Sequence, residues 1–88
     1  MVLIMEKLNS GSNQRSRLFM SKLLNALIRE RTRKNITPDM IASHLGYDAG
    51  EYVRIEKGEQ PLYLSDFFNI CDLMCEDPRE IIRDLAKD

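Results

Sequence analysis

Two cysteines and one histidine are the residues whose types are best suited to binding a metal. Cys71 and Cys75 are four residues apart, which puts both on one face of a helix, and the only histidine is His44. A structural zinc site needs four ligands, usually arranged as two closely spaced pairs. This chain offers one such pair, and His44 belongs to a different predicted helix. We therefore expect no metal site and no cofactor, an exposed His44, and cysteines that are buried or half-buried free thiols.

Catalytic chemistry has little support in the sequence. General acid–base catalysis needs two titratable groups that converge on one reacting atom, and a nucleophile needs an adjacent base. A lone histidine without an adjacent nucleophile, and carboxylates scattered over helical surfaces, do not provide such a pair. We expect that this protein is not an enzyme.

Arg54 is the side chain best suited to specific recognition. Its planar guanidinium can donate two hydrogen bonds to O6 and N7 of a guanine in the major groove of DNA. This contact requires the helix that carries Arg54 to lie in the groove. The alternative role for Arg54 is a surface ion pair with a nearby carboxylate.

Residues 37–58, TPDMIASHLGYDAGEYVRIEKG, predict the two helices that would position Arg54. Ala42 lies in the first helix, and Gly46 follows four residues later in the turn. Ile55 falls on the inward side of the second helix, which Gly58 closes. A helix-turn-helix needs this order, because the helices cross tightly at a small residue and the turn needs a residue that tolerates positive φ. Such units commonly place their second helix in the major groove.

This segment resembles the Cro/repressor-type (Xre-type) helix-turn-helix regulators, whose pattern is close to T-x-x-x-[LI]-A-x-x-L-G-x-[ST]-x-x-x-[IV]-x-x-[IL]-E-x-G-x-x-x-P. Asp48 replaces the usual Ser or Thr, Tyr52 replaces a β-branched residue, and Pro61 comes one position early. The resemblance covers roughly residues 16–85. It implies an all-α, five-helix bundle of the lambda-repressor-like DNA-binding type with a central helix-turn-helix. The matching residues are Thr37, Ile41, Ala42, Leu45, Gly46, Ile55, Glu56 and Gly58.

The resemblance implies that bases are contacted from the start of the second helix of this motif. Ala49 can touch only a thymine methyl group, and Gly50 offers only its backbone. Glu51 can accept a hydrogen bond from cytosine N4 but is repelled by phosphates, which leaves Arg54 as the one strong reader. The implied base-contacting residues are Asp48, Ala49, Gly50, Glu51 and Arg54.

Phosphate contacts are expected around the same motif. Pro38 stands where the family often has a glutamine that holds a phosphate, and proline has neither an amide proton nor a polar side chain. Arg15 and Arg17 would act from a mobile N-terminal arm, as such arms do in other DNA-binding proteins. The expected phosphate-contacting residues are Arg15, Arg17, Arg33, Lys34, Thr37, Lys57 and Gln60.

Charge is distributed unevenly along the 88 residues, although the net charge is only −1. Residues 1–57 carry ten Lys/Arg against six Asp/Glu, and residues 58–88 carry three against eight. The helix-turn-helix lies in the basic half. A basic surface attracts the phosphate backbone, so this distribution favours double-stranded DNA as the partner, with the acidic half facing away.

Length and hydropathy predict one helical domain. Residues 1–15 include a Gly/Ser-rich stretch and are expected to form a flexible arm, and residues 16–88 the helix-turn-helix domain. The expected helices are 16–32, 38–45, 48–57, one capped by Ser65, and one that begins at Asp77 and Pro78. Asn35 suits a left-handed cap after the first helix. No apolar run approaches a membrane span and the opening residues do not fit a signal peptide, so we expect a cytoplasmic protein.

Two functions remain open at this point. The first is a small transcriptional regulator of phage, mobile-element, restriction-modification or antitoxin type that binds a pseudo-palindromic operator as a homodimer. Its dimer contact is expected at Ile81, Ile82 and Leu85, with help from residues 1–5. The second is a protein-interaction module, such as an anti-repressor or regulatory adaptor, that holds another regulatory protein through the surface around Tyr47, Glu51 and Tyr52.

Overall fold

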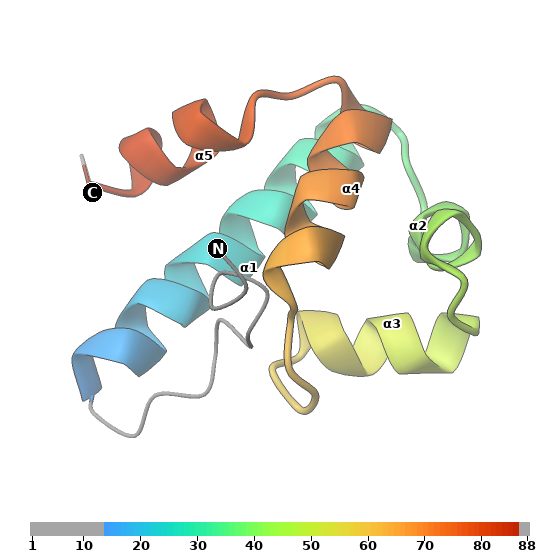
Figure 1. Cartoon of the computed structure of the whole chain (residues 1–88), viewed down its shortest axis with the longest axis horizontal. Helices are drawn as coiled ribbons and strands as arrows, with labels where there is room; N and C mark the ends of the chain where they lie inside the picture. The colour runs from blue at the N-terminus through green and yellow to red at the C-terminus, as the bar shows by residue number, and fades with distance from the viewer. Residues whose placement is uncertain (1–13, 87–88) are drawn as a thin grey trace.

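Five helices make up the described part of this computed structural model, which covers residues 14–86 and the side chains of residues 15–86. No strand is present within that range. The predicted all-α, five-helix fold is therefore confirmed, while residues 1–13 of the predicted arm lie outside the described residues. The helices are α1 (Gln14–Arg33), α2 (Pro38–Leu45), α3 (Ala49–Glu56), α4 (Leu64–Met74) and α5 (Pro78–Leu85), shown in Figure 1.

The long helix α1 supplies one wall of the core. Apolar residues recur along it at spacings of three and four, and this stripe faces inward. The chain leaves α1 at Asn35, which has φ of 60° as predicted for a left-handed cap. Because α1 begins at Gln14, Arg15 and Arg17 lie inside its first turns and not in an arm that precedes it. The buried α1 residues are Met20, Leu23, Leu24, Ala26 and Leu27.

Helices α2 and α3 form the predicted helix-turn-helix. Thr37 caps α2 by accepting a hydrogen bond from the Met40 amide at 3.2 Å, and Pro38 occupies the first turn. Gly46 ends α2 with φ of 83°, and the next amide, that of Tyr47, donates to the Ala42 carbonyl at 2.9 Å. Only 2% of Ala42 is exposed. Both predictions for this turn are confirmed: a buried small residue at the crossing and a left-handed glycine.

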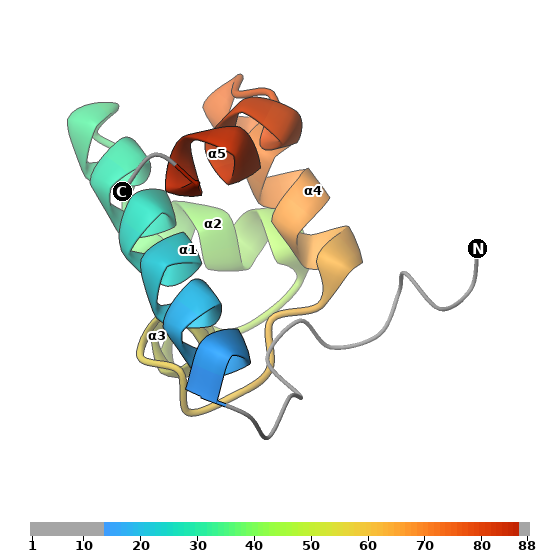
Figure 2. The same cartoon turned by 90° about the vertical axis from the view of Figure 1, so that its left-hand side faces the viewer.

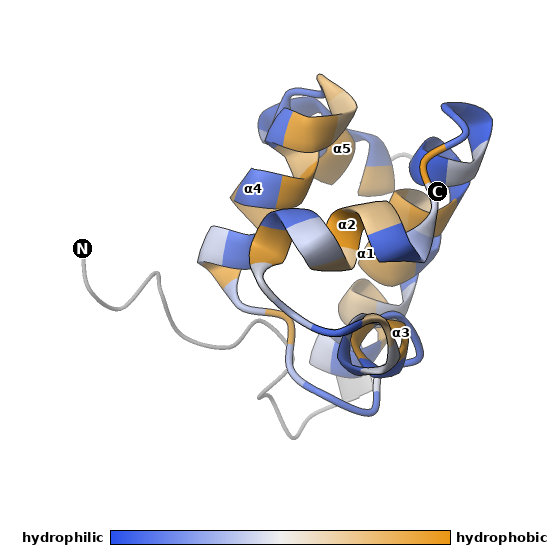
Figure 3. Cartoon of the chain, turned by 90° about the vertical axis from the view of Figure 1, so that its right-hand side faces the viewer, coloured by the Kyte–Doolittle hydropathy of each residue, from blue (hydrophilic) through white to orange (hydrophobic). Residues whose placement is uncertain are grey.

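Helix α4 closes the core over α2. Its residues Phe67, Ile70, Cys71 and Met74 are all buried. The prediction that Ser65 caps this helix is wrong, because α4 begins at Leu64 after Tyr63 and has no side-chain cap. Burial of Leu62 just before the helix fixes the path of the chain there, so packing sets the helix start instead of a capping hydroxyl. In Figure 3, orange and blue segments alternate along α2 and α4, as expected of helices with one buried face.

Helix α5 packs on α1, at the opposite end of the molecule from α3 (Figures 1 and 2). Asp77 caps α5 by accepting from the Arg79 amide, and Pro78 follows, as predicted. Ile81 and Leu85 are each 5% exposed, whereas Ile82 is 40% exposed. The prediction of a dimer contact through all three residues must therefore be corrected. Ile81 and Leu85 belong to the core of a single chain, and only Ile82 is available to a second one.

Candidate nucleic-acid interface

The outer side of α3 is an exposed surface made of small and charged residues. Ala49, Gly50 and Arg54 are exposed, while Tyr52 and Ile55 point into the core. This is the two-faced arrangement that a recognition helix needs, since its inner side must hold the helix to the domain. Burial of Tyr52, which is 1% exposed, also corrects the prediction that Tyr52 contributes to a protein-binding surface.

Asp48 and Glu51, two of the predicted base contacts, form hydrogen bonds with each other's backbone amide at the start of α3. The Asp48 carboxylate accepts from the Glu51 amide at 2.8 Å, and the Glu51 carboxylate accepts from the Asp48 amide at 3.3 Å. This reciprocal capping box satisfies two amides that the helix leaves without partners, and both anions complement the helix dipole. Of the five predicted base contacts, Ala49, Gly50 and Arg54 are those not used to start the helix.

The Arg54 guanidinium is held at one edge and lies beside the exposed part of α3. Its Nε donates to the Gln60 side-chain oxygen at 2.7 Å. A Cβ built on Gly50 would lie 3.8 Å from Nη1 of Arg54, so the guanidinium packs over the smallest residue of the helix. The Arg54 carbonyl in turn accepts from the amides of Glu59 and Gln60, at 2.9 and 3.3 Å. Gln60 therefore orients the arginine, which reduces the rotamer entropy lost when Arg54 binds a partner.

The far end of α3 is anchored to α1 by an ion pair. Arg31 donates from Nε and Nη2 to the two carboxylate oxygens of Glu56, at 2.6 and 2.9 Å. The two side chains are 15% and 9% exposed. Hydrogen bonding to Glu56 raises the pKa of Arg31 further. This contact fixes the orientation of α3 relative to α1, and it was not singled out from the sequence even though Glu56 is part of the matched pattern.

Arg33 and Lys34 lie away from α3, which changes the predicted set of phosphate contacts. Arg33 donates to Glu30 at 2.5 Å and to Glu76 at 3.2 Å, and Lys34 pairs with Glu76 at 2.8 Å. Lys34 also donates to the Met74 carbonyl at the end of α4. Their carboxylate partners neutralise both cations, and they serve to join the end of α1 to the connection between α4 and α5.

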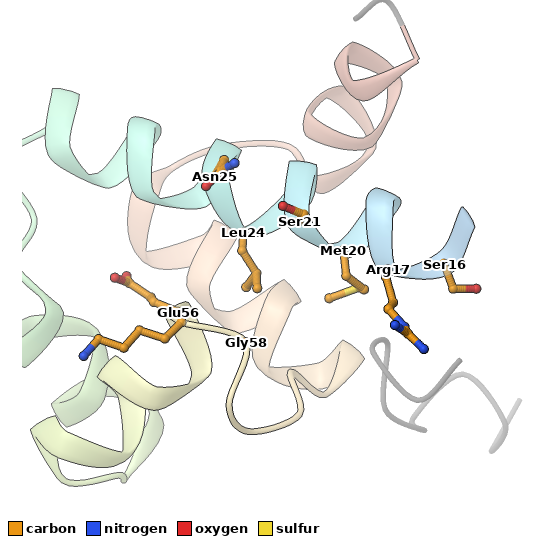
Figure 4. A pocket seen from close by; sticks show the side chains of 9 residues that line it. Ser16, Arg17, Met20, Ser21, Leu24, Asn25, Glu56 and Gly58 are labelled. Atoms are coloured by element: carbon orange, nitrogen blue, oxygen red, sulfur yellow. The ribbon is translucent and has the colours of Figure 1, made fainter. Parts of the chain in front are cut away.

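A second pair of predicted phosphate contacts is brought together instead. Arg17 from the first turns of α1 and Lys57 from the end of α3 line the same cleft, which has a volume of about 410 Å³. Figure 4 shows the side chains of Met20 and Leu24 pointing from α1 into this cleft, towards the turn at Gly58. In this cleft the structure brings Arg17 of α1 close to Lys57, the residue that follows α3. Arg15 is exposed on α1, Thr37 caps α2, and Gln60 holds Arg54.

The candidate metal ligands are dispersed. His44 is exposed, as predicted, and Cys71 is buried. Cys75 is exposed, which corrects the prediction that both thiols are at least half-buried: it ends α4 with φ of 57° and so turns away from the core. Burial raises the pKa of the Cys71 thiol to about 12, so this sulfur stays protonated near neutral pH. Among residues 14–86, no three His, Cys, Asp or Glu side chains are grouped to hold a metal ion.

Helices that could cross a bilayer are also absent from the described part of the chain. Comparisons of the sequence with protein-family models, with curated proteins and with solved structures found no match. The likeness to Xre-type regulators therefore depends on the pattern in residues 37–58 and on the geometry of α2 and α3, and family membership stays a prediction.

Proposed function

We propose that this protein binds double-stranded DNA by placing α3 in the major groove, and that it acts as a transcriptional regulator. The observation that carries the proposal is the outer side of α3, where Arg54 is oriented by Gln60 beside two small exposed residues, Ala49 and Gly50. Small residues let the helix backbone approach the base edges, and the guanidinium supplies the paired donors that guanine accepts.

Two cations beside the end of α3 would bind DNA phosphates. Arg17 and Lys57 line one cleft next to α3, so a DNA strand that follows this edge meets two cations. The ion pairs of Arg33 and Lys34 make those residues poor candidates for phosphate contacts. Sequence readout would then be narrow, with one strong base contact supported by backbone contacts and groove shape.

A homodimer remains part of the proposal because a single α3 covers only one half-site. Two copies related by a two-fold axis would place their α3 helices about 34 Å apart, one turn of the duplex. Ile82 is the residue of the predicted dimer contact that remains exposed, at 40%. The buried side of α5 is therefore excluded as the dimer contact.

Salt-dependent binding tests the proposal. Fluorescence anisotropy with a labelled random-sequence duplex should give a straight line for log affinity against log salt, with a slope of about −0.9 per phosphate contacted. Lys57→Ala should make this slope shallower by about one unit. Arg83→Ala removes the same charge on α5, far from α3, and should leave the slope unchanged. Equal effects of the two variants, or no binding at low salt, would overturn the proposed DNA contact.

A protein-interaction module is the second candidate function. The observation in its favour is that Asp48 and Glu51 place two anions at the start of α3, where DNA phosphates would be repelled. If the duplex fails to bind at low salt while the chain stays folded, this second function becomes the better account of the same helix-turn-helix.

A further inference from the structure

An apolar groove lies between the start of α1 and the outer side of α5. Its volume is about 340 Å³. Leu18 is 60% exposed, Phe19 39% and Ile82 40%, and these are three of the six large hydrophobic residues exposed in residues 15–86. A continuous apolar patch with a polar rim is typical of a surface that binds another molecule. The lining residues are Arg15, Leu18, Phe19, Lys22, Ile82, Leu85 and Ala86.

Two cations flank this groove without partners in the described structure. Arg15 and Lys22 are seven residues apart, two helical turns, so they lie on the same side of α1 with Leu18 between them. Neither forms an ion pair with any other residue of the described chain. Arg31, Arg33 and Lys34, at the other end of the same helix, are all paired with carboxylates. Among the described residues, Arg15 and Lys22 are therefore unpaired cations that lie beside the exposed apolar side chains of α1.

We propose that this groove binds an acidic amphipathic helix of a partner protein. The apolar stripe of that helix would cover Leu18, Phe19 and Ile82, and its carboxylates would pair with Arg15 and Lys22. A helix of two to three turns spans about 11–16 Å, which matches the two turns between the cations. The apolar lining favours protein over nucleic acid, because a phosphate backbone would leave Leu18 and Phe19 in contact with water.

Charge complementarity selects this occupant over the chain's own first eight residues and over α5 of a second copy. Residues 1–8, MVLIMEKL, contain the single carboxylate Glu6 followed directly by Lys7, so the segment has little net charge to offer two cations. The exposed side of α5 in a second copy combines Glu80 and Asp84 with Arg79 and Arg83, and its charges cancel in the same way. A foreign helix with carboxylates on both flanks of its apolar stripe fits the groove better than either.

The groove lies on the face of α1 opposite the cleft beside α3, and the two share no lining residue. A partner bound there would not cover Arg54. The inference thus goes beyond DNA binding, and it would let a second protein attach to the chain while α3 remains available.

Two synthetic peptides and the full isotope-labelled chain test the proposal. Both peptides carry leucines at helical positions i, i+3 and i+7, and they differ only in having glutamates or lysines beside that stripe. The glutamate peptide should bind at least about tenfold more tightly, because it gains two ion pairs where the lysine peptide meets like charges. Its NMR shift changes should fall on Leu18, Phe19, Lys22 and Ile82 and leave Arg54 unchanged.

Surface variants test whether the glutamate peptide binds at the groove and not elsewhere on the protein. Leu18→Glu should weaken binding of the glutamate peptide about tenfold or more, since it removes apolar contact and adds repulsion. Phe68→Glu is the matched control, because Phe68 is also exposed, at 43%, but lies on α4 outside the groove. Arg15→Glu combined with Lys22→Glu should reverse the preference in favour of the lysine peptide. Helix content measured by circular dichroism should be the same in all variants.

Several results would overturn the proposal. Equal affinity for both peptides, or an equal loss in Leu18→Glu and Phe68→Glu, would show that no specific groove site exists. Groove signals that shift in the double variant Leu3→Ser, Ile4→Ser would identify the chain's own N-terminal segment as the occupant. Self-association abolished by Leu18→Glu would identify a second copy, and groove shifts on adding a duplex would identify DNA.

Discussion

Arg31 on α1 binds both carboxylate oxygens of Glu56, the last residue of α3, and so connects the longest helix to the proposed recognition helix. The distances are 2.6 and 2.9 Å, and the Arg31 Nη1 also reaches the Ile36 carbonyl at 3.3 Å. One guanidinium thus contacts both the end of α3 and the loop before α2. The position of the helix-turn-helix on α1 depends on this side chain.

Removing either partner of this pair should destabilise the fold. Glu56→Met or Arg31→Met leaves a mostly buried charge without its counter-charge, at a cost of about 2–4 kcal/mol. Changing both residues to methionine should cost less than the sum of the single changes, because no unpaired charge remains. Urea unfolding of the four proteins measures this coupling. Arg79→Met, which breaks an exposed pair with Asp77, should change stability little, and strictly additive effects of the first two variants would contradict the account.

Ala42 should not tolerate a larger side chain. Ala42→Leu inserts three carbon atoms where α2 packs in the core, and overpacking there should cost about 1–3 kcal/mol. Ala49→Leu makes the same change at an exposed site and should alter stability by less than about 0.5 kcal/mol. Thermal unfolding followed by circular dichroism compares them. Equal melting temperatures for the two variants would mean that the crossing is not tightly packed.

The turn after α2 and the start of α4 show which parts of the fold are predictable from local sequence. The burial of Ala42 and the left-handed Gly46 follow from the steric needs of one short turn, so a single sequence is enough to predict them. The start of α4 was mispredicted at Ser65 because burial of Leu62, and not a cap, decides it. Contacts between segments that are distant in the sequence determine such boundaries, and the spacing of residues carries no information on those contacts.

The candidate site was predictable only in part, for the same reason. A basic run at the end of α1 predicted phosphate contacts, but Arg33 and Lys34 share Glu76, more than 40 residues away in sequence. The apolar residues Ile81, Ile82 and Leu85 of α5 were identified, but their spacing contains no information on which of them cover the core of their own chain. Ile81 and Leu85 were therefore assigned to a dimer although they are buried.

Removal of the Tyr52 hydroxyl group should leave the stability of the fold unchanged or increase it. This side chain is 1% exposed, and its hydroxyl meets no hydrogen-bond partner among the described residues. Burial first, and then the negative charge of Glu56, raise the pKa of Tyr52. Tyr52→Phe removes a desolvated polar atom and should be neutral or stabilising by up to about 1 kcal/mol. Chemical unfolding provides the check, and a loss of stability larger than that of Tyr47→Phe would contradict the assignment.

Tyr47 should stabilise the fold in a pH-dependent way. Its hydroxyl donates to Asp66 at 2.5 Å, and this hydrogen bond, with partial burial, raises the pKa of Tyr47 to about 12. An unfolded tyrosine titrates near pH 10, so the folded chain holds this proton more tightly. The stabilisation is therefore complete below about pH 10 and is lost as the pH rises towards 12.

Tyr47→Phe should thus be less stable than the wild type by about 1 kcal/mol at neutral pH, and this difference should shrink towards zero near pH 12. Urea unfolding at a series of alkaline pH values measures the difference. Tyr63→Phe, at an exposed tyrosine, should resemble the wild type throughout. A difference between Tyr47→Phe and wild type that stays constant from neutral pH upwards would show that the hydrogen bond to Asp66 does not contribute.

Selection of binding sites from a pool of random DNA duplexes tests the central claim most directly. The full chain should enrich duplexes that share at least one fixed guanine, and Arg54→Ala should lose the preference at that guanine while it still binds DNA, at a cost of about 1–3 kcal/mol on the preferred site. Arg29→Ala, a change of equal charge on α1, should enrich the same sequences as the wild type. The claim is contradicted if the wild-type chain enriches no sequence at low salt, or if Arg54→Ala selects the same guanine as the wild type.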